Sequence, residues 1–452
     1  MAENGNRRPW HVAADGLCVR CGACFKMCPL DLIHTDADLF PRITEADLKR
    51  CKDCDLCMRP CPADVDYPAL SKRIFGRATE PQDAVGVLRE VYVGHSLNSR
   101  TRAAGSSGGA GTELLAHLLR TGAAEQVLVC GMEPEHPWLT RPFLATTEDE
   151  VISAAQSKYT IVPQMQDLGP ITKWKKKTAV IGLPCHLHAL RKLEAWRPAL
   201  TENIVMMIGL ACHSTLERDA TLKLLEVHGI RPEDVARLEY RGGEHWPRGV
   251  QVTLKNGEVH RVRALDIKAA FNYLKCFYSP DRCLLCTDYS AELSDVTVMD
   301  PWIRDASGNH PYQEGWSLLL SRTERGQALI DRAAADHSLH VEKIDRTLLA
   351  SQFDPVVKSK KKGAFIRIGE RRGRGLPVPD YGFPIPAPTA GERRAEFVAS
   401  FLRLPGRHAW SRDLGMRLAF SRLGDWLMRM RTAQKIRNAA ARARRAAAQP
   451  TL

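Results

Sequence analysis

The sequence has neither a long hydrophobic run nor an apolar leader. It lacks any stretch of about 18 consecutive apolar residues, the length that a membrane-spanning helix requires. The longest apolar segment lies near Ile204 to Cys212. The start, MAENGNRRPW, lacks the apolar segment of a secretory signal. We therefore expect a soluble, cytoplasmic protein.

Cysteine is too sparse for a disulfide-stabilised scaffold, since it accounts for 14 of 452 residues. Wholesale disorder is excluded by an apolar fraction of 44%. The length suggests about three domains. The net charge of +13 is moderately basic.

Eight of the cysteines lie between Cys18 and Cys61, in two copies of one spacing. The copies read Cys18-x2-Cys21-x2-Cys24-x3-Cys28-Pro29 and Cys51-x2-Cys54-x2-Cys57-x3-Cys61-Pro62. This is the bacterial ferredoxin spacing, in which the fourth cysteine ligates the other cluster. We therefore assign one [4Fe–4S] cluster to Cys18, Cys21, Cys24 and Cys61, and a second to Cys28, Cys51, Cys54 and Cys57.

Two zinc knuckles are the alternative, because C-x2-C is also zinc spacing. Zinc, however, has no use for a proline after the last cysteine of both copies. The sequence therefore predicts that residues 1–77 form an α+β, ferredoxin-like iron–sulfur module that carries electrons.

Alternating strands and helices are expected over residues 84–345, after a polar linker at residues 78–83. Strands are predicted at residues 87–93, 126–130, 178–182 and 204–211, and a helix at residues 112–121. This alternation is typical of an α/β domain. The glycine-rich turn at residues 105–111 precedes the helix and offers a weak phosphate-binding signal, but it lacks the dinucleotide fingerprint of a Rossmann fold.

Three of the remaining six cysteines form a second kind of motif. Cys276, Cys283 and Cys286 follow a C-x6-C-x2-C spacing and offer three sulfurs to a third cluster. Cys212, at the end of an apolar strand, is the first choice for the fourth ligand, and Cys185 is held in reserve. Cys130 is expected to be an ordinary buried thiol.

An ordered set of motifs over residues 85–345 resembles the family of beta subunits of coenzyme F420-reducing hydrogenase. The motifs are Ser107-Gly108-Gly109, Ser157-Lys158-Tyr159, Gly182-Leu-Pro-Cys185, Tyr240-Arg241-Gly242-Gly243 with Trp246-Pro247, Cys283-x2-Cys286-Thr-Asp288 continuing to Asp295, and Gly315-Trp316-Ser317. The resemblance implies a non-covalent FAD beside a [4Fe–4S] cluster.

The same resemblance implies flavin contacts at Ser107, Gly108, Gly109, Ser157, Lys158 and Tyr159. Lys158 would lie near a flavin carbonyl or phosphate, where a cation stabilises negative charge. The sequence departs from the hydrogenase subunits at Asp300-Pro301-Trp302, so Asp300 and Trp302 are candidates to shape a different substrate pocket. No catalytic residue is assigned.

Residues 346–452 are expected to form a basic, helical extension. A lysine run (Lys358, Lys360, Lys361 and Lys362) precedes a Pro/Gly-rich tract that should wrap or link. From Ala395 onward, apolar residues recur at helical spacing among arginines, and residues 435–445 contain no acidic residue. Three functions compete for this segment: docking on its own domain or a partner helix, contact with an anionic membrane surface, and, least favoured, nucleic-acid binding, for which no fold is recognised.

The favoured hypothesis is an iron–sulfur flavoprotein oxidoreductase. It would pass electrons between the ferredoxin-type clusters and a two-electron organic partner through FAD, with coenzyme F420 as one candidate. The redox partner would be a ferredoxin or another oxidoreductase subunit, and no nucleic-acid partner is expected. The alternative is a non-catalytic electron-transfer subunit that docks on a larger complex through its C-terminal helix. The protein would be cytoplasmic, or peripheral at the membrane.

Overall fold

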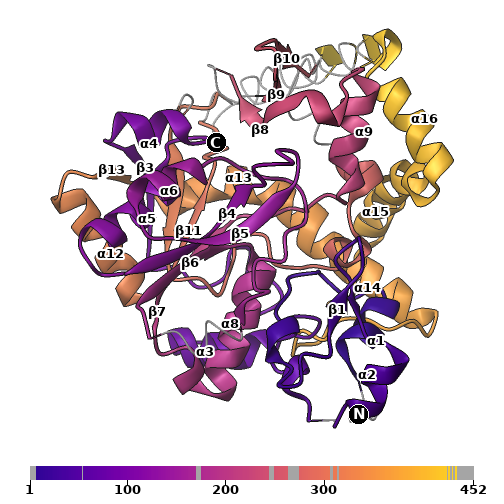
Figure 1. Ribbon diagram of the computed structural model, residues 1–452, viewed down its shortest axis with the longest axis horizontal. Coiled ribbons are helices and arrows are strands. Elements are labelled where there is room, and N and C mark those ends of the chain that lie inside the picture. Colours follow the sequence, from indigo (N-terminus) through magenta and orange to yellow (C-terminus); the bar gives the residue numbers. More distant parts are fainter. Residues whose placement is uncertain are drawn as a thin grey trace, which may run out of the picture.

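A computed structural model (Figure 1) describes residues 7–52, 54–168, 175–243, 249–262, 274–305, 309–312, 315–424, 426, 427, 430, 433 and 434. The Trp246-Pro247 motif and the tail at residues 435–445 lie outside these ranges. Within them, none of the helices has the length and apolar character that a membrane crossing requires.

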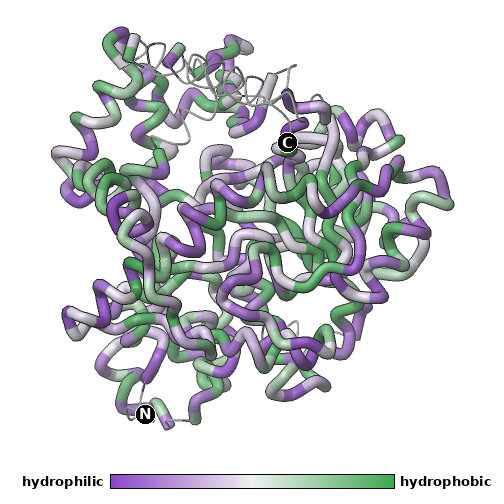
Figure 2. The backbone as a smooth tube through the Cα atoms, turned by 180° about the vertical axis from the view of Figure 1, so that it is seen from behind, coloured by the Kyte–Doolittle hydropathy of each residue, from purple (hydrophilic) through white to green (hydrophobic). Residues whose placement is uncertain are grey.

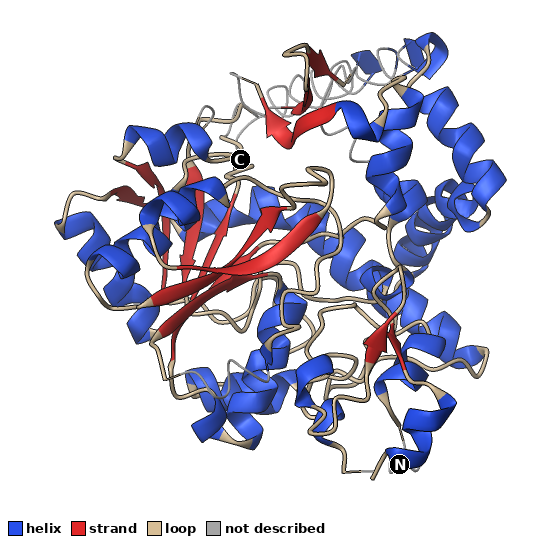
Figure 3. Ribbon diagram, in the orientation of Figure 1, coloured by secondary structure: helices blue, strands red, loops and turns tan. Residues whose placement is uncertain are grey.

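An eight-stranded mixed sheet forms the centre of the molecule (Figure 3). Its strands, in chain order, are β3 (Glu90–Ser96), β4 (Gln126–Met132), β5 (Thr140–Ala145), β6 (Thr178–Gly182), β7 (Ile204–Leu210), β11 (Val296–Met299), β12 (Ser317–Ser321) and β13 (Leu339–Lys343). Their spatial order is β13-β3-β12-β11-β7-β6-β4-β5. Neighbouring strands are parallel from β4 through β6 and β7 to β11, whereas β5, β12 and β13 run antiparallel to their neighbours.

The mixed α/β fold expected for the middle of the chain is confirmed. Three predicted strands match β4, β6 and β7 closely, and the predicted helix matches α5 (Ala110–Arg120). The first strand begins three residues later than predicted, at Glu90 instead of residue 87. Figure 2 shows hydrophobic residues concentrated along the central strands.

Helices cover both faces of this sheet because successive side chains of a strand point to opposite faces. Val127 and Val129 pack with α5 and α12 (Glu324–Ala335), while Leu128 packs with α8 (Pro184–Trp196) on the other face. α13 (Leu349–Val356) covers β3 and β12 on that second face. Two shorter helices, α4 (Ser99–Ala104) and α6 (Glu148–Ser153), lie beside α5.

The N-terminal module consists of short elements. They are α1 (Pro9–Ala14), η2 (Phe25–Met27), β1 (His34–Thr35), β2 (Pro41–Arg42), α2 (Glu45–Arg50), η3 (Leu56–Met58) and α3 (Tyr67–Phe75). The module is fastened to the rest of the chain by charged contacts. Arg20, which is buried, donates to both carboxylate oxygens of Glu217 at 2.6 and 2.7 Å, and Lys192 donates to the carbonyl oxygen of Cys61 at 2.5 Å.

A second, three-stranded sheet lies apart from the central one. It contains β8 (Val235–Gly242), β9 (Gly249–Leu254) and β10 (Val259–Arg261), and α9 (Asp219–Val227) packs with it in a separate apolar core. Met416 of α16 (Ala409–Ala419) is buried in the same core.

The segment after residue 346 packs into the body. α13 continues through the π-helical turn η7 (Val357–Lys362) into α14 (Gly363–Gly373), and α15 (Ala390–Arg403) and η8 (Leu404–Arg407) precede α16. The Pro/Gly-rich tract wraps as expected, because Val65 donates to the Asp380 carbonyl oxygen at 2.8 Å. Two lysines of the run, Lys360 and Lys361, are buried, which the sequence did not indicate.

Candidate functional site

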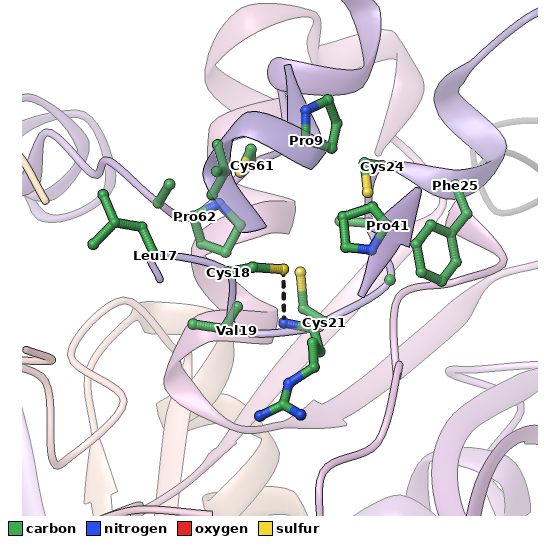
Figure 4. Close-up of a pocket in the computed structure, with 15 residues that line it drawn as sticks. Pro9, Leu17, Cys18, Val19, Cys21, Cys24, Phe25, Pro41, Cys61 and Pro62 are labelled. Carbon is green, nitrogen blue, oxygen red and sulfur yellow. Dashed lines mark hydrogen bonds between the residues drawn. The ribbon is translucent and has the colours of Figure 1, made fainter. Parts of the chain in front are cut away.

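The first cysteine set surrounds one pocket (Figure 4). The sulfurs of Cys18, Cys21, Cys24 and Cys61 lie around a space lined by apolar residues such as Leu17. Cys18 Sγ accepts a hydrogen bond from the Arg20 backbone N–H at 3.3 Å. Burial raises the pKa of the Cys18 thiol to about 12, so a metal that binds here must displace protons.

The second set surrounds another pocket of the N-terminal module. Cys28, Cys51, Cys54 and Cys57 line it, together with the apolar residues Leu30, Leu32, Ile33 and Ile43. Burial raises the pKa of the Cys57 thiol to about 12. The structure thus brings together both predicted sets, each with its fourth cysteine from the other motif copy, while iron binding itself stays a prediction.

A third cysteine pocket lies at the carboxyl edge of the central sheet. Its sulfurs come from Cys185, Cys212, Cys283 and Cys286. Cys185 follows β6 in the first turn of α8, and Cys212 follows β7. β6 and β7 are parallel neighbours, so the residues after them meet at one edge of the sheet. α11 (Asp281–Leu284) supplies Cys283.

The cysteines that line this pocket differ at one position from the predicted ligand set, and which of them bind a cluster stays a prediction. Cys276 does not line the pocket, and Cys185, the reserve candidate, stands there instead. Cys276 belongs to a helical turn at residues 274–278. That turn packs on the C-terminal helices, since a side chain at Gly406 would lie 2.9 Å from the Cys276 carbonyl oxygen. The signal for Cys185 was its position just after a strand in Gly182-Leu-Pro-Cys185.

Two buried cations also line the third pocket. Lys360 is 3% exposed and donates to the carbonyl oxygens of His213 and Cys283 at 2.5 and 3.4 Å. Burial opposes its charge, but the neighbouring cysteine sulfurs outweigh this effect and raise the pKa of Lys360. No carboxylate of the described residues lies within salt-bridge distance of it. Arg282 donates to Tyr381 Oη at 2.9 Å.

Each of the three pockets is lined by four cysteine thiols, the number of ligands that a [4Fe–4S] cluster takes. Among the described residues, no three His, Cys, Asp or Glu side chains stand close enough to ligate one metal ion, as tetrahedral zinc would require. At the third pocket, Lys360 and Arg282 supply positive charge that a buried group with four thiolates needs.

The three pockets form a continuous series. Val19 and Pro62 line both the first and the third pocket, so the two pockets are neighbours. The turn η2, which lies between Cys24 and Cys28, contacts η3, which contains Cys57, so the second set lies next to the first. The order in space is therefore second, first, third, and it ends at the edge of the sheet.

Several residues that the resemblance assigned to a flavin form hydrogen bonds with two further serines of the chain, Ser106 and Ser317. Ser107 Oγ lies 3.2 Å from Ser317 Oγ, and the Gly108 N–H donates to the same hydroxyl at 3.1 Å. The Ser157 N–H donates to Ser106 Oγ at 2.8 Å. Ser106 belongs to the glycine-rich turn at residues 105–111 and Ser317 to the Gly315-Trp316-Ser317 motif, but the sequence assigned no role to either hydroxyl.

The glycines of this loop are required by packing within the chain. A Cβ atom on Gly108 would lie 2.7 Å from the Gly94 carbonyl oxygen. Gly109, with φ +72°, adopts the left-handed conformation that begins α5. Close packing at Gly108 and the left-handed backbone at Gly109 therefore account for both glycines without requiring a bound ligand.

Lys158, Tyr159 and Asp300 also face protein groups. The Lys158 ammonium donates to the carbonyl oxygens of Ala154 and Ala155 at 2.5 and 2.6 Å, and burial lowers its pKa to about 8. Its position near a flavin carbonyl or phosphate stays a prediction. The Tyr159 ring packs edge-on against Tyr240. Asp300, a candidate for the substrate pocket, forms an ion pair with buried Arg241 at 2.7 Å.

Comparison with known proteins identifies the family. Family models described as the N-terminal and C-terminal parts of the coenzyme F420 hydrogenase/dehydrogenase beta subunit match residues 91–168 and 175–347. The chain belongs to this family. The resemblance inferred from the sequence is confirmed, and the residues matched by the family models end before Lys360 and the C-terminal helices.

Three relatives show the range of the family. A component of the F(420)H(2) dehydrogenase of Methanosarcina mazei is 26% identical over 71% of this chain and 83% of its own length. The beta subunit of coenzyme F420 hydrogenase of Methanococcus voltae is 30% identical over 53% of this chain and 79% of its own length. Coenzyme F420-dependent sulfite reductase of Methanocaldococcus jannaschii is 24% identical over 78% of this chain, which spans about half (52%) of that relative.

A solved structure of a hydrogenase complex shares the fold of this chain. One polypeptide of the F420-reducing [NiFe] hydrogenase complex from Methanosarcina barkeri superposes with a TM-score of 0.51 at 21% identity. The match covers 68% of this chain and 99% of that one.

Proposed function

We propose that this protein is an oxidoreductase subunit that passes electrons between three [4Fe–4S] clusters and a two-electron organic partner. The single observation that carries the proposal is the set of three pockets, each lined by four cysteines, of which the first and the third share the lining residues Val19 and Pro62. A [4Fe–4S] cluster supplies one-electron chemistry. The proposed ligand sets are the two N-terminal sets and Cys185, Cys212, Cys283 and Cys286.

Coenzyme F420 is the proposed organic partner. The names of all three relatives contain F420. The third pocket also lies at the carboxyl edge of the central sheet, which is where α/β folds bind their ligands. FAD is the proposed link between one-electron and two-electron chemistry. The proposal of FAD rests on the family resemblance alone. The residues that the resemblance assigns to FAD make hydrogen bonds to other groups of the protein and add no support of their own.

This chain's own residues would keep the cluster sites dry and charge-balanced. Leu17 and Phe25 close the first pocket, and Leu32 and Ile33 close the second. Lys360 and Arg282 place positive charge at the third. The proposed redox sites thus lie in largely apolar surroundings, and each pocket also has at least one cationic residue in its lining.

The test is anaerobic purification with chemical reconstitution, followed by iron analysis and assay. We expect about twelve irons per chain, since three clusters hold four each, and oxidation of reduced F420 with a one-electron dye as acceptor. A well-folded chain that takes up no iron would contradict the whole proposal. A chain with about twelve irons that never reacts with F420 would contradict the assigned organic partner.

A non-catalytic relay subunit of a larger complex is the second candidate. The solved structural relative belongs to a hydrogenase complex, and the C-terminal helices expose large apolar residues such as Phe397 and Trp410. Full turnover of F420 by the isolated chain would contradict this second candidate.

A further inference from the structure

The helix α15 is oriented opposite to an ordinary amphipathic helix. Its one buried residue is Glu396, which forms ion pairs with Arg367 at 2.7 Å and with Arg403. Its two phenylalanines face outward, since Phe397 is 74% exposed and Phe401 65%. A surface helix normally buries its apolar side, so the apolar side of α15 has no partner within the described chain.

The helix α16 repeats this orientation along most of its length. Trp410 is 72% exposed, and Leu414 and Leu418 follow it at spacings of four residues. Its polar residues instead bind the body: Arg412 pairs with Asp219 at 3.1 Å, and Asp413 pairs with Lys223. Figure 1 shows α16 at the outer edge of the molecule. The helix is therefore held by charge and presents its apolar residues to the outside.

These residues form what we call the C-terminal apolar face. Its members are large apolar residues that are each about half exposed or more, namely Phe397, Val398, Phe401, Leu402, Trp410, Leu414, Leu418, Leu423, Trp426, Leu427 and Met430. Soluble proteins rarely expose so many large apolar side chains in neighbouring segments without a binding role.

The charge around this face is positive. The carboxylates of Glu392, Glu396 and Asp413 are paired, the first with Lys362 and the others as above. In contrast, the guanidinium groups of Arg393, Arg394, Arg407 and Arg422 have no carboxylate of the described chain within salt-bridge distance. The sequence after Asp425 contains several arginines and no acidic residue.

We propose that the C-terminal apolar face binds the surface of an anionic lipid bilayer, with α15 and α16 lying in the plane of the headgroups. Trp, Phe and Leu together with arginine are the composition of interfacial helices, and each basic residue near an anionic surface adds attraction. A protein partner would need carboxylates at fixed positions to match these arginines, whereas mobile anionic headgroups meet them anywhere. The binding is peripheral, and the residues that would carry it lie outside those that the family models match.

The test is sedimentation of the anaerobically purified full chain with vesicles. Vesicles of phosphatidylglycerol mixed with phosphatidylethanolamine should pull the protein down, and vesicles of phosphatidylcholine alone should not. Phe397→Glu/Trp410→Glu should weaken binding at least tenfold. The matched control is Leu48→Glu/Leu97→Glu, which places the same charges on leucines 51% and 49% exposed elsewhere and should bind as the parent protein does.

A second variant changes only the charge. Arg393→Gln/Arg394→Gln leaves the apolar residues in place and should lower binding to the anionic vesicles severalfold. Equal sedimentation with anionic and neutral vesicles would overturn the proposal, as would an unchanged affinity of Phe397→Glu/Trp410→Glu. A dimer in solution that the same variant converts to monomers would also overturn it, because a second copy would then cover the face. Vesicle binding needs no electron transfer, so its failure is separate from failure of the proposed redox function.

Discussion

The Lys360 ammonium lies 2.5 Å from the carbonyl oxygen of His213, inside the pocket of the third cysteine set. An ammonium has three N–H donors, and the Cys283 carbonyl oxygen at 3.4 Å takes a second one. The position fixes a positive charge beside four thiols, in a site with a low effective dielectric constant. Adding an electron to a group held there is favoured by that charge.

Replacing Lys360 with methionine should lower the midpoint potential of the third cluster. Met preserves much of the side-chain length but removes the charge that stabilises the reduced form. We expect the ratio of reduced to oxidised cluster at a fixed potential to fall about tenfold, which corresponds to about 59 mV for one electron. A dithionite titration followed by electron paramagnetic resonance measures the shift, and Lys360→Arg should restore most of it.

The same lysine run provides the matched control for this titration. Lys362 is 47% exposed and pairs with Glu392 on the surface, so Lys362→Met should leave the midpoint potential unchanged. An equal potential in Lys360→Met and the parent, each with its full iron content, would show that the Lys360 charge does not act on the cluster.

Exchanging Cys185 for serine should remove one cluster, and the same exchange at Cys276 should not. Cys185 lines the third pocket and Cys276 does not. We therefore expect iron content to fall by about four per chain in Cys185→Ser and to stay at the parent level in Cys276→Ser. The reverse result would restore the ligand set predicted from the sequence spacing.

The contrast between these two cysteines shows what the sequence could and could not indicate. The N-terminal sets were predictable because their ligands follow one short, repeated spacing. The third set depends on two parallel strands, β6 and β7, lying side by side. The spacing of Cys185 and Cys212 does not indicate that pairing, whereas Cys276 is close to Cys283 in sequence but does not line the pocket.

The C-terminal segment shows a second limit. Helical periodicity in residues 395–430 predicted amphipathic helices, and α15 and α16 are there. Periodicity does not tell which side faces the body, and here ion pairs such as Arg412–Asp219 hold the polar side inward. Likewise, a lysine run is usually solvated, yet Lys361 is buried because it meets Glu292 at 3.0 Å.

Lys361→Met should destabilise the protein strongly at pH 8. The variant leaves the buried Glu292 carboxylate without its cation, and breaking a buried pair in this way typically costs about 3–5 kcal/mol. Lys362→Met breaks a surface pair and should cost at most about 1 kcal/mol. Equilibrium denaturation of both variants gives the comparison, and equal losses would mean that the Lys361–Glu292 pair is not solvent-shielded.

The Glu292 carboxyl should also make stability depend on pH. Burial raises the pKa of Glu292 from its ordinary 4.5 to about 7, so between these values the folded state binds a proton that the unfolded state has released. The contribution of Glu292 to stability therefore falls as pH rises from about 4.5 to 7 and is constant above that. Glu292→Gln keeps the uncharged shape and should flatten this part of the curve, measured as the free energy of unfolding at pH 5, 6, 7 and 8.

The neighbouring Asp288 does not supply the same slope, because interactions such as the His188 hydrogen bond hold its pKa below the ordinary value despite burial. If parent and Glu292→Gln show equal slopes between pH 5 and 7, the carboxylate is already ionised in the folded protein and Lys361 neutralises it throughout.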